Sequence, residues 1–321
     1  MSEQSWCAPL APWVARLEGL SDVDEPVVVA CSGGPDSLAL LALATAAGLT
    51  PVAAYVDHGL RGEAAGEAAL VARVACRWGL PARSVRTSVD PGPNLEARAR
   101  AARYDALDAV RQEVGANAVL VGHTADDQAE TVVLNLLRGS ASAGLGAMAV
   151  RRGWVVRPIL GLRRADCEAI CAVAGVEPVR DPMNADLGLR RVRVRHEVLP
   201  TLGAAAGRDL VPVLARQAVV LRSESDYLDE LARGAWPPAP PVPVPEAGTA
   251  PAPAAALGDL PVVLARRAVR LWVGSPPPSF AEVERVLAVA RGDIRGTQLA
   301  GGRSVRRRDG VLHLDRASVD G

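Results

Sequence analysis

The chain has 321 residues, more than one domain usually holds, so we expect two domains. Hydrophobic residues make up 49% of it and aromatic residues only 3%, which predicts a large and mainly aliphatic core. The formal net charge is zero, which excludes a strongly basic nucleic-acid binder in bulk and leaves any contact with nucleic acid to local arginine clusters. Every one of the 36 basic residues is arginine.

The cysteines and the apolar runs indicate where the protein works. The five cysteines are scattered and odd in number, and no Cys-x-x-Cys pair occurs, so we expect small buried thiols in a reducing compartment. The N-terminus lacks the positive segment and apolar core of a signal peptide, and the apolar run at 38–49 is too short to span a bilayer. We therefore expect a soluble cytoplasmic protein without a membrane partner.

The first 207 residues alternate between strand and helix patterns. An amphipathic helix is predicted at 8–20, and β-branched runs predict strands at 27–30, 51–56, 82–86, 118–121 and 154–159. Helices are predicted after residue 37 and at 63–78, 94–114 and 163–175. This alternation predicts an α/β fold with a doubly wound parallel sheet.

The remaining residues change in composition. Residues 208–235 predict a linking helix, centred on 210–231, and the Pro/Ala-rich stretch 236–261 predicts an extended, poorly ordered insertion. Residues 262–321 predict a smaller α+β domain with helices at 264–272 and 280–291 and hairpins within 297–314. Residues 1–207 would then be the catalytic domain.

Residues 32–37, which read Ser-Gly-Gly-Pro-Asp-Ser, are the most informative segment of the chain. A strand, a glycine-rich turn and a helix in this order place free backbone N–H groups around an anion. The segment offers glycines that can take positive φ, a proline suited to a first helical turn, hydroxyl donors and one carboxylate, namely Gly33 and Gly34, Pro35, Ser32 and Ser37, and Asp36. Because a carboxylate does not bind phosphate directly, Asp36 indicates a bridging Mg²⁺.

Two familiar phosphate loops are excluded at this position. The Walker loop needs Gly-Lys-Ser/Thr, and the dinucleotide loop needs Gly-x-Gly-x-x-Gly. A tight turn without a ligand is the structural alternative. The full pattern directly after a strand favours a polyphosphate site.

Polar residues follow two other predicted strands. Asp57 and His58 end the strand after the loop helix, where open α/β sheets bind ligands. Asp126 and Asp127 begin a helix that follows another strand, and helix capping alone would explain one such acid. The nearby residues His123, Gln128 and Glu130 favour an active-site wall instead.

Further motifs follow the loop in order along the chain. The series comprises the loop, Asp57-His58-Gly59-Leu60-Arg61, Asn94-Leu95-Glu96-Ala97 with Arg100 and Arg103-Tyr104, His123-x-x-Asp126-Asp127-Gln128-x-Glu130-Thr131, Arg138-Gly139, Arg157-Pro158, Asp181-Pro182-x-Asn184 and Arg195-His196. This ordered series resembles the tRNA(Ile)-lysidine synthetases, a family of PP-loop ATP pyrophosphatases. It covers residues 27 to about 200. The segment 296–314 resembles, more weakly, the C-terminal tRNA-binding domain of that family. Thr124 stands where the family often has a second histidine, and Val192 where it usually has asparagine.

This resemblance implies a reaction and its residues. ATP, with Mg²⁺, would adenylate the wobble cytidine of tRNA(Ile) and release pyrophosphate, and free L-lysine would then displace AMP to form lysidine. The implied catalytic residues are Asp36, His123, Asp126, Asp127 and Arg195, and the implied ATP site comprises Ser32, Gly33, Gly34, Pro35, Asp36, Ser37, Asp57, His58 and Arg100, with Asp36 as the metal ligand. Which of Asp126 and Asp127 serves lysine or metal stays open.

Two arginine clusters are candidates for phosphate contacts. Arg191, Arg193 and Arg195 alternate with valines, so a solvated strand face is an equal alternative to contact with tRNA or ATP. Arg303 and Arg306 to Arg308 crowd one turn near the C-terminus, where phosphate binding is favoured.

Other activities of the same fold remain as alternatives. A PP-loop tRNA thiolase commonly needs a Cys-x-x-Cys pair, which this chain lacks. An ammonia-dependent synthetase fed by glutamine needs a glutaminase unit that the remaining residues do not supply. A non-catalytic ATP-binding module would keep the loop but has no need of the acids at 126, 127 and 130.

Overall fold

The computed structural model describes residues 6–57, 64–88, 92, 95–179, 186–236 and 249–316. The chain forms two compact units, Met1–Arg222 and Ser223–Gly321. Helix α10 (Val211–Ala235) crosses from one unit into the next, so the linking helix predicted at 208–235 contributes to both.

The first unit is built on a six-stranded sheet. In chain order its strands are β1 (Val28–Ala30), β2 (Val52–Asp57), β3 (Ala82–Arg86), β4 (Val119–Val121), β5 (Arg151–Arg152) and β6 (Val155–Val156). They lie in the order β3-β2-β1-β4-β6-β5, and all neighbours are parallel except β5 and β6. The predicted α/β fold with a doubly wound, mainly parallel sheet is confirmed.

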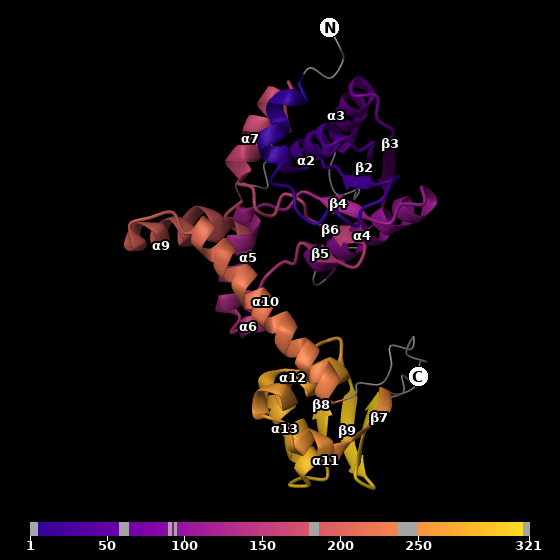
Figure 1. Cartoon of the computed structure of the whole chain (residues 1–321), viewed down its shortest axis with the longest axis vertical. Helices are drawn as coiled ribbons and strands as arrows, with labels where there is room; N and C mark the ends of the chain where they lie inside the picture. The colour runs from indigo at the N-terminus through magenta and orange to yellow at the C-terminus, as the bar shows by residue number, and fades with distance from the viewer. Residues whose placement is uncertain are drawn as a thin grey trace. The chain divides into compact units, whose positions relative to one another are not determined.

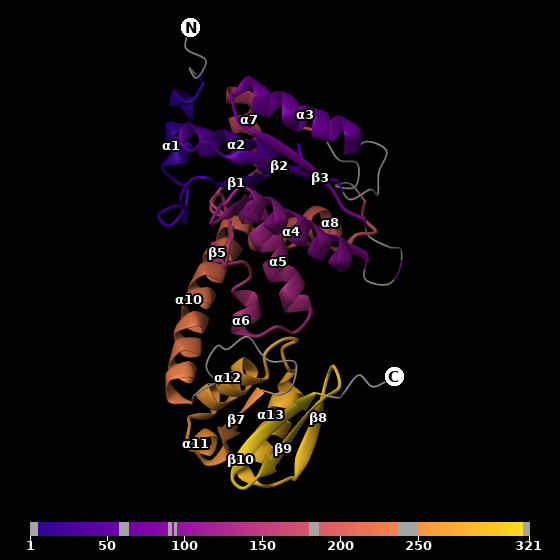
Figure 2. The ribbon, with the colours of Figure 1, turned by 90° about the vertical axis from the view of Figure 1, so that its right-hand side faces the viewer.

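Helices cover both faces of this sheet (Figure 2). The first helices of this unit are α1 (Ala11–Val14), α2 (Pro35–Ala46), α3 (Ala64–Arg77), α4 (Leu95–Glu113), α5 (Ala125–Leu137) and α7 (Arg164–Val173), and the short α6 (Ser142–Leu145) packs on α5. Because side chains alternate along a strand, Val27 and Val29 pack with α2, α3 and α7, whereas Val28 and Ala30 pack with α4. Two aliphatic cores result, one on each face.

Two predictions in this unit were wrong in detail, and a strand at 190–196, which was one of two alternatives, is excluded. The helix predicted at 8–20 is a short 3-10 turn η1 (Ala8–Leu10) and α1, which ends at Val14; Leu17 and Leu20 still pack on the core from a turn. The strand predicted at 154–159 has two residues, and the antiparallel strand β5 beside it was not predicted. Residues 190–196 are helical, not a strand: they form α8 (Arg190–Arg193) and the start of a π-helical turn, η3 (Val194–Val198).

A third apolar cluster packs along one side of α5. Residues Ala125, Ala129 and Val133 pack against Val194, and the start of α9 (Leu199–Ala206) and of α10 completes the cluster. Among the described helices, none alone is long and apolar enough to cross a membrane; only the stretch from α8 to α9 together with α10, bent by 95° at their junction, meets that test of length and composition.

The second unit is a four-stranded antiparallel sheet with helices on one face (Figure 1). Its elements are β7 (Thr249–Pro253), α11 (Ala254–Gly258), α12 (Val262–Val273), α13 (Phe280–Arg291), β8 (Gly296–Leu299), β9 (Arg303–Arg308) and β10 (Val311–Arg316), with strand order β7-β10-β9-β8. The predicted helices and hairpins are confirmed. The prediction of an extended insertion at 236–261 was wrong for β7 and α11, because Ala252 and Leu257 join the core of this unit. Trp236 anchors the same core, and its indole N–H donates to Pro253 O at 2.9 Å.

Candidate active site

The loop between β1 and α2 has the backbone of an anion site. Gly33 takes φ +82°, which favours glycine, whereas Gly34 takes φ −76°, so only one of the two glycines needs positive φ. Gly34 is the N-cap of α2 and has no side chain to bond the first-turn N–H groups, and Pro35 occupies the first turn as predicted. The amide groups at this helix start are therefore available to phosphate.

The two serines of the loop have different tasks. The buried Ser37 hydroxyl donates to Gly34 O at 2.9 Å and accepts from the Ser32 N–H at 3.1 Å, so it holds the turn closed. Ser32 is exposed, and its hydroxyl lies 3.3 Å from Ser37 Oγ. Ser37 is thus a support for the loop, while Ser32 presents a hydroxyl to solvent.

Gly122, at the carboxyl end of β4, lets the loop helix approach. A Cβ built at this position would lie 2.8 Å from Asp36 O and 3.1 Å from Ser37 N, both backbone atoms. No side chain fits there without displacing the first turn of α2. This glycine was not predicted as a site residue, because nothing local to it reveals a neighbour that is 86 residues away in the chain.

Asp36 has the environment of a metal ligand. Its Oδ1 is buried without a hydrogen-bond partner, and its Oδ2 lies 3.8 Å from Arg164 Nε. Burial, with the charge of Asp127, raises the Asp36 pKa to about 6 against the opposing effects of Arg164, the Cys167 thiol and Arg195. An unpaired buried carboxylate oxygen is costly, and a divalent cation would satisfy it.

Asp126 and Asp127 project from the first turn of α5 and make different contacts. Asp126 accepts from Arg163 Nε and Nη2 at 3.1 Å each and from the Arg164 backbone N–H at 2.8 Å, so it holds the start of α7. Asp127 Oδ2 closes a capping box with Thr124, accepting its N–H at 2.9 Å, and Asp127 Oδ1 faces Arg164 and Arg191. Capping and site formation therefore coexist in Asp127.

Glu130 is the centre of an arginine cluster. Its side chain is buried, and it accepts from Arg191 Nε and Arg195 Nε at 2.7 Å each and from Arg164 at 3.4 Å. Arg191 and Arg195 lie four residues apart and reach the same carboxylate, which explains why the alternating segment is helical. Burial alone would raise the Asp127 pKa, but Arg191 and Arg164 hold it below its ordinary value.

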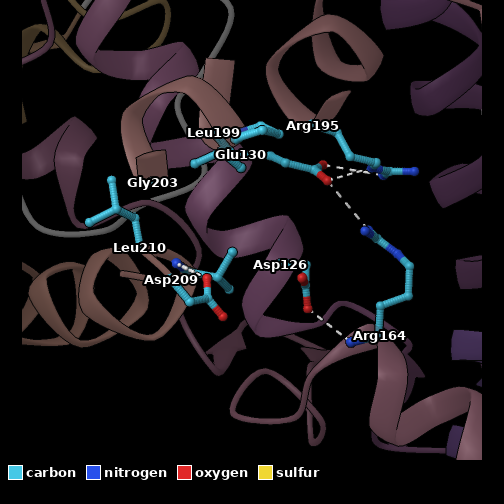
Figure 3. Close-up of a pocket in the computed structure, with 10 residues that line it drawn as sticks. Asp126, Glu130, Arg164, Arg195, Leu199, Gly203, Asp209 and Leu210 are labelled. Atoms are coloured by element: carbon cyan, nitrogen blue, oxygen red, sulfur yellow. Dashed lines mark hydrogen bonds and ion pairs between the residues drawn. The ribbon is translucent and has the colours of Figure 1, made fainter. Parts of the chain in front are cut away.

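A cavity of about 230 Å³ opens beside this cluster. Figure 3 shows the Glu130 carboxylate facing Arg164 and Arg195, with Asp126 below it and Gly203, Asp209 and Leu210 together on the left. Half of the lining is thus apolar and half is charged. Arg163 joins Asp126 to Asp209, its second carboxylate partner, at 2.6 Å.

His123, Arg157 and Arg100 form a second network at the end of β4. Arg157 is buried, and its Nε donates to His123 Nδ1 at 3.2 Å. Arg100 donates to the Tyr104 hydroxyl at 3.3 Å and stacks over its ring, and Tyr104 also interacts with Arg157. The structure therefore brings Arg100 and His123 together.

One other predicted residue, Asp57, contacts β3, and several lie outside the described part of the chain. Asp57 ends β2, and its carboxylate lies 3.7 Å from the exposed Arg86 on β3. His58, Asn94, Asp181 and Asn184 lie outside the described residues. Sequence reasoning missed Arg163 and Arg164; the only signal was their position at the start of a helix that follows Arg157-Pro158.

The family of the chain follows from comparison with known proteins. The sequence model of the PP-loop domain matches residues 13–202, more than half of the chain. The chain is 41% identical to the tRNA(Ile)-lysidine synthase of Thermobifida fusca over 89% of its length and 90% of that protein. The chain belongs to the tRNA(Ile)-lysidine synthase family. The enzyme of Mycolicibacterium paratuberculosis is also 41% identical, over 91% of both chains.

A solved structure supports the fold alone. The U34-tRNA thiolase NcsA from Methanococcus maripaludis, described with its [4Fe-4S] cluster, aligns with a TM-score of 0.54 at 15% identity and covers 68% of this chain and 79% of its own. Membership of the PP-loop family implies ATP binding, and the relatives are tRNA-modifying enzymes by name. The resemblance stated from the motifs is therefore confirmed at the level of the family.

The cysteines beneath the loop are buried thiols. Burial, the largest influence on each, raises the pKa of Cys31 to about 11 and of Cys171 to about 12, and it also raises the pKa of Cys167. The Cys171 thiol donates to Pro35 O at 3.4 Å. No group of three or more metal-binding side chains is found among the described residues.

The C-terminal arginines divide into buried and exposed ones. Arg303 is buried, and its guanidinium donates to the carbonyl oxygens of Ala300, Val273 and Pro276, so its prediction as a phosphate contact was wrong. Arg307 is exposed but donates to Ala290 O at 2.9 Å. Because side chains alternate along a strand, Arg306 and Arg308 lie on the face of β9 opposite to Arg307. In the strand register Arg306 lies opposite His313 of β10.

Proposed function

We propose that the protein ligates free lysine to the wobble cytidine of tRNA(Ile), using ATP and releasing AMP and pyrophosphate. The observation that carries this proposal is the position of Arg164. Its guanidinium lies 3.8 Å from Asp36 of the phosphate loop, 3.3 Å from Asp127 and 3.4 Å from Glu130. The phosphate loop and the acidic wall of α5 are thus parts of one site.

The phosphate loop would hold the pyrophosphate that leaves. Backbone N–H groups at the start of α2 would bind it, with the exposed Ser32 hydroxyl beside them. Asp36 would hold Mg²⁺, which offsets charge on the phosphates. Arg164 would remain close to the metal-binding carboxylate and would compensate negative charge at the reacting phosphate.

The charged cavity beside Glu130 would take the lysine. Its apolar wall, from Leu199 to Val211, suits the aliphatic stem of an amino acid, and its arginines suit a carboxylate. The ammonium group of lysine would displace an arginine from Asp127 or Glu130, because both carboxylates are paired with arginine in the structure. A desolvated amine beside these arginines loses its proton more easily, which its attack requires.

The tRNA would contact the second unit through exposed arginines. Arg306 and Arg308 lie on the sheet face opposite the helices, where no described helix covers them. Such side chains bind phosphate oxygens without reading sequence. The choice of tRNA(Ile) rests on the names of the relatives.

Sulfur transfer, the first alternative, has less support. Thiolate chemistry needs a thiol whose pKa is lowered, and the three thiols beneath the loop have theirs raised by burial. A non-catalytic ATP-binding module would use the phosphate loop but would have no need of the charged cavity beside it. The cavity therefore favours an amine as the group that attacks the activated base.

The test is the incorporation of labelled lysine. Purified protein is incubated with ATP, Mg²⁺, radiolabelled lysine and a tRNA(Ile) that carries wobble cytidine, and the tRNA is digested and analysed by mass. We expect label in that nucleoside and AMP formation that requires both lysine and tRNA. Arginine, whose guanidinium stays protonated, should not replace lysine. ATP cleavage without label in the tRNA would show that lysine is not the amine that is joined to the tRNA.

A further inference from the structure

The contact between Arg157 and His123 fixes where the histidine carries its proton. The Nε of an arginine always bears hydrogen, so the nitrogen that receives it must offer a lone pair. Arg157 Nε lies 3.2 Å from His123 Nδ1. The proton of the neutral ring is therefore on Nε2, and His123 is a hydrogen-bond donor on the side away from Arg157.

Arg157 is itself held so that it cannot turn away. Its Nη1 donates to Ala149 O at 2.8 Å, its backbone N–H donates to Val150 O, and the residue as a whole is 6% exposed. Tyr104 interacts with the same guanidinium and receives Arg100. Arg157 thus acts through His123 as a positioning residue.

Burial and the surrounding arginines keep His123 neutral. Burial is the largest cause, and Arg157, Arg100 and Arg191 add to it, so that the pKa falls to about 3 although Asp127 opposes this. At neutral pH the ring neither gives up nor accepts a proton. His123 is therefore unsuited to general acid or base catalysis, which works best with a pKa near the working pH.

His123 lies in the chain between two residues that connect the phosphate loop with α5. It stands between Gly122, which touches the backbone of Asp36, and Thr124, which caps α5. The ring is half-buried, and among the described residues its Nε2 has no hydrogen-bond partner. A donor without a partner beside a phosphate loop has a substrate oxygen as its natural acceptor.

We propose that His123 is a neutral Nε2–H donor to an oxygen of the reacting substrates, and that Arg157 fixes this tautomer. The acceptor of this hydrogen bond would be a phosphate oxygen of ATP or the carbonyl oxygen of the base, both of which carry more negative charge as the reaction proceeds. This role rests on the proposed function for its substrates. The tautomer itself does not.

The first experiment measures the tautomer without any activity. The full chain is labelled with ¹⁵N-histidine, and two-bond ¹⁵N–¹H correlation identifies which ring nitrogen is protonated; the chain has four histidines, and His123→Gln assigns the signal. We expect the Nε2–H form, unchanged between about pH 6 and about pH 8, where an ordinary histidine titrates. An Nδ1–H form or an imidazolium at neutral pH would overturn the proposal, even if the protein made lysidine.

The second experiment separates a donor from a merely space-filling ring. Glutamine places an N–H₂ near the position of Nε2, glutamate places only acceptors there, and asparagine is too short to reach it. We expect His123→Gln to stay within about ten-fold of wild-type, and His123→Glu and His123→Asn to lose about 100-fold or more, as for loss of one donor to a developing charge. Equal activity of the Gln and Glu variants would refute the donor role.

The same variants tell the two acceptors apart. If ATP binding without tRNA weakens in His123→Asn, the acceptor is a phosphate oxygen; if only the tRNA-dependent step slows, it is the base. Arg157→Met should add little to the loss in a His123→Gln background but much in wild-type, because the two residues act in series. Should Arg157→Met fail to fold, the wild-type spectrum still decides the tautomer. Additive losses in a folded double variant would refute the positioning role.

Discussion

Replacing Glu130 by glutamine tests the arginine cluster on which the candidate site is built. Glutamine keeps the shape of the side chain and one acceptor oxygen but removes the charge. Arg191, Arg195 and Arg164 would then share a neutral partner in a buried position. The cost comes from positive charge left without compensation, not from an altered volume.

The structure sets the size of this effect. Breaking a buried ion pair usually costs about 3–5 kcal/mol. The Arg191 and Arg195 side chains keep 35% and 21% of their exposure, so water relieves part of the penalty and we expect the lower end, about 3 kcal/mol. For a unit of this size about 3 kcal/mol lowers Tm by roughly 6–12 °C.

The assay is urea and thermal unfolding of the full chain, followed by far-UV circular dichroism. The matched control is Glu113→Gln in the same unit, because Glu113 pairs with Arg83 while both side chains are about half exposed or more, at 62% and 48%. That pair should contribute no more than about 0.5 kcal/mol. A loss below about 1 kcal/mol in Glu130→Gln, or losses of the same size in both variants, would refute the reasoning.

Three further predictions address the loop, the metal and the tRNA surface. Gly122→Ala should destabilise the first unit by about 1–3 kcal/mol and weaken ATP binding, because its Cβ would meet the backbone of Asp36. The control Gly66→Ala, in an open position of α3, should stabilise the unit by up to about 1 kcal/mol. Equal effects of the two variants on unfolding and on ATP titration would contradict this. Asp36→Asn should abolish Mg²⁺-dependent ATP cleavage. Because the pKa of Asp36 is raised from 3.8 to about 6, the folded wild-type binds the proton more tightly, so its stability falls as pH rises through that window, and the Asn variant should lack this fall. Arg306→Ala with Arg308→Ala should weaken tRNA binding and lower the salt slope by about one per lost phosphate contact; an unchanged slope would remove this surface from the tRNA site.

Local sequence patterns were enough to predict the α/β sheet and the phosphate loop of this protein. Alternating β-branched and leucine-rich segments predicted the strands and helices of the sheet, and its parallel order followed from their alternation. The loop was predicted from adjacent residues, since Gly33, Pro35 and Asp36 act on the backbone or on a ligand within one turn. Such features depend on neighbours in sequence, and the sequence shows those neighbours.

Short-range patterns failed where distant contacts decide the structure. Residues 190–196 alternate like a strand, but they are helical because Arg191 and Arg195 both pair with Glu130, 61 and 65 residues away in the chain. The Pro/Ala-rich stretch joined a sheet because Ala252 completes the core of the second unit. In each case a tertiary contact outweighs a weak local preference.

The sequence by itself determined which acids and which loop make the candidate site, but only the tertiary structure decided their partners. The acids at 126, 127 and 130 were predicted to form an active-site wall, with no partner assigned to them, whereas the fold brings Arg163, Arg164, Arg191 and Arg195 onto them. The physical reason is that charge compensation acts through space. A buried carboxylate is paired with whichever cation the packing of helices brings within hydrogen-bond distance, and that cation leaves no mark beside it in the chain.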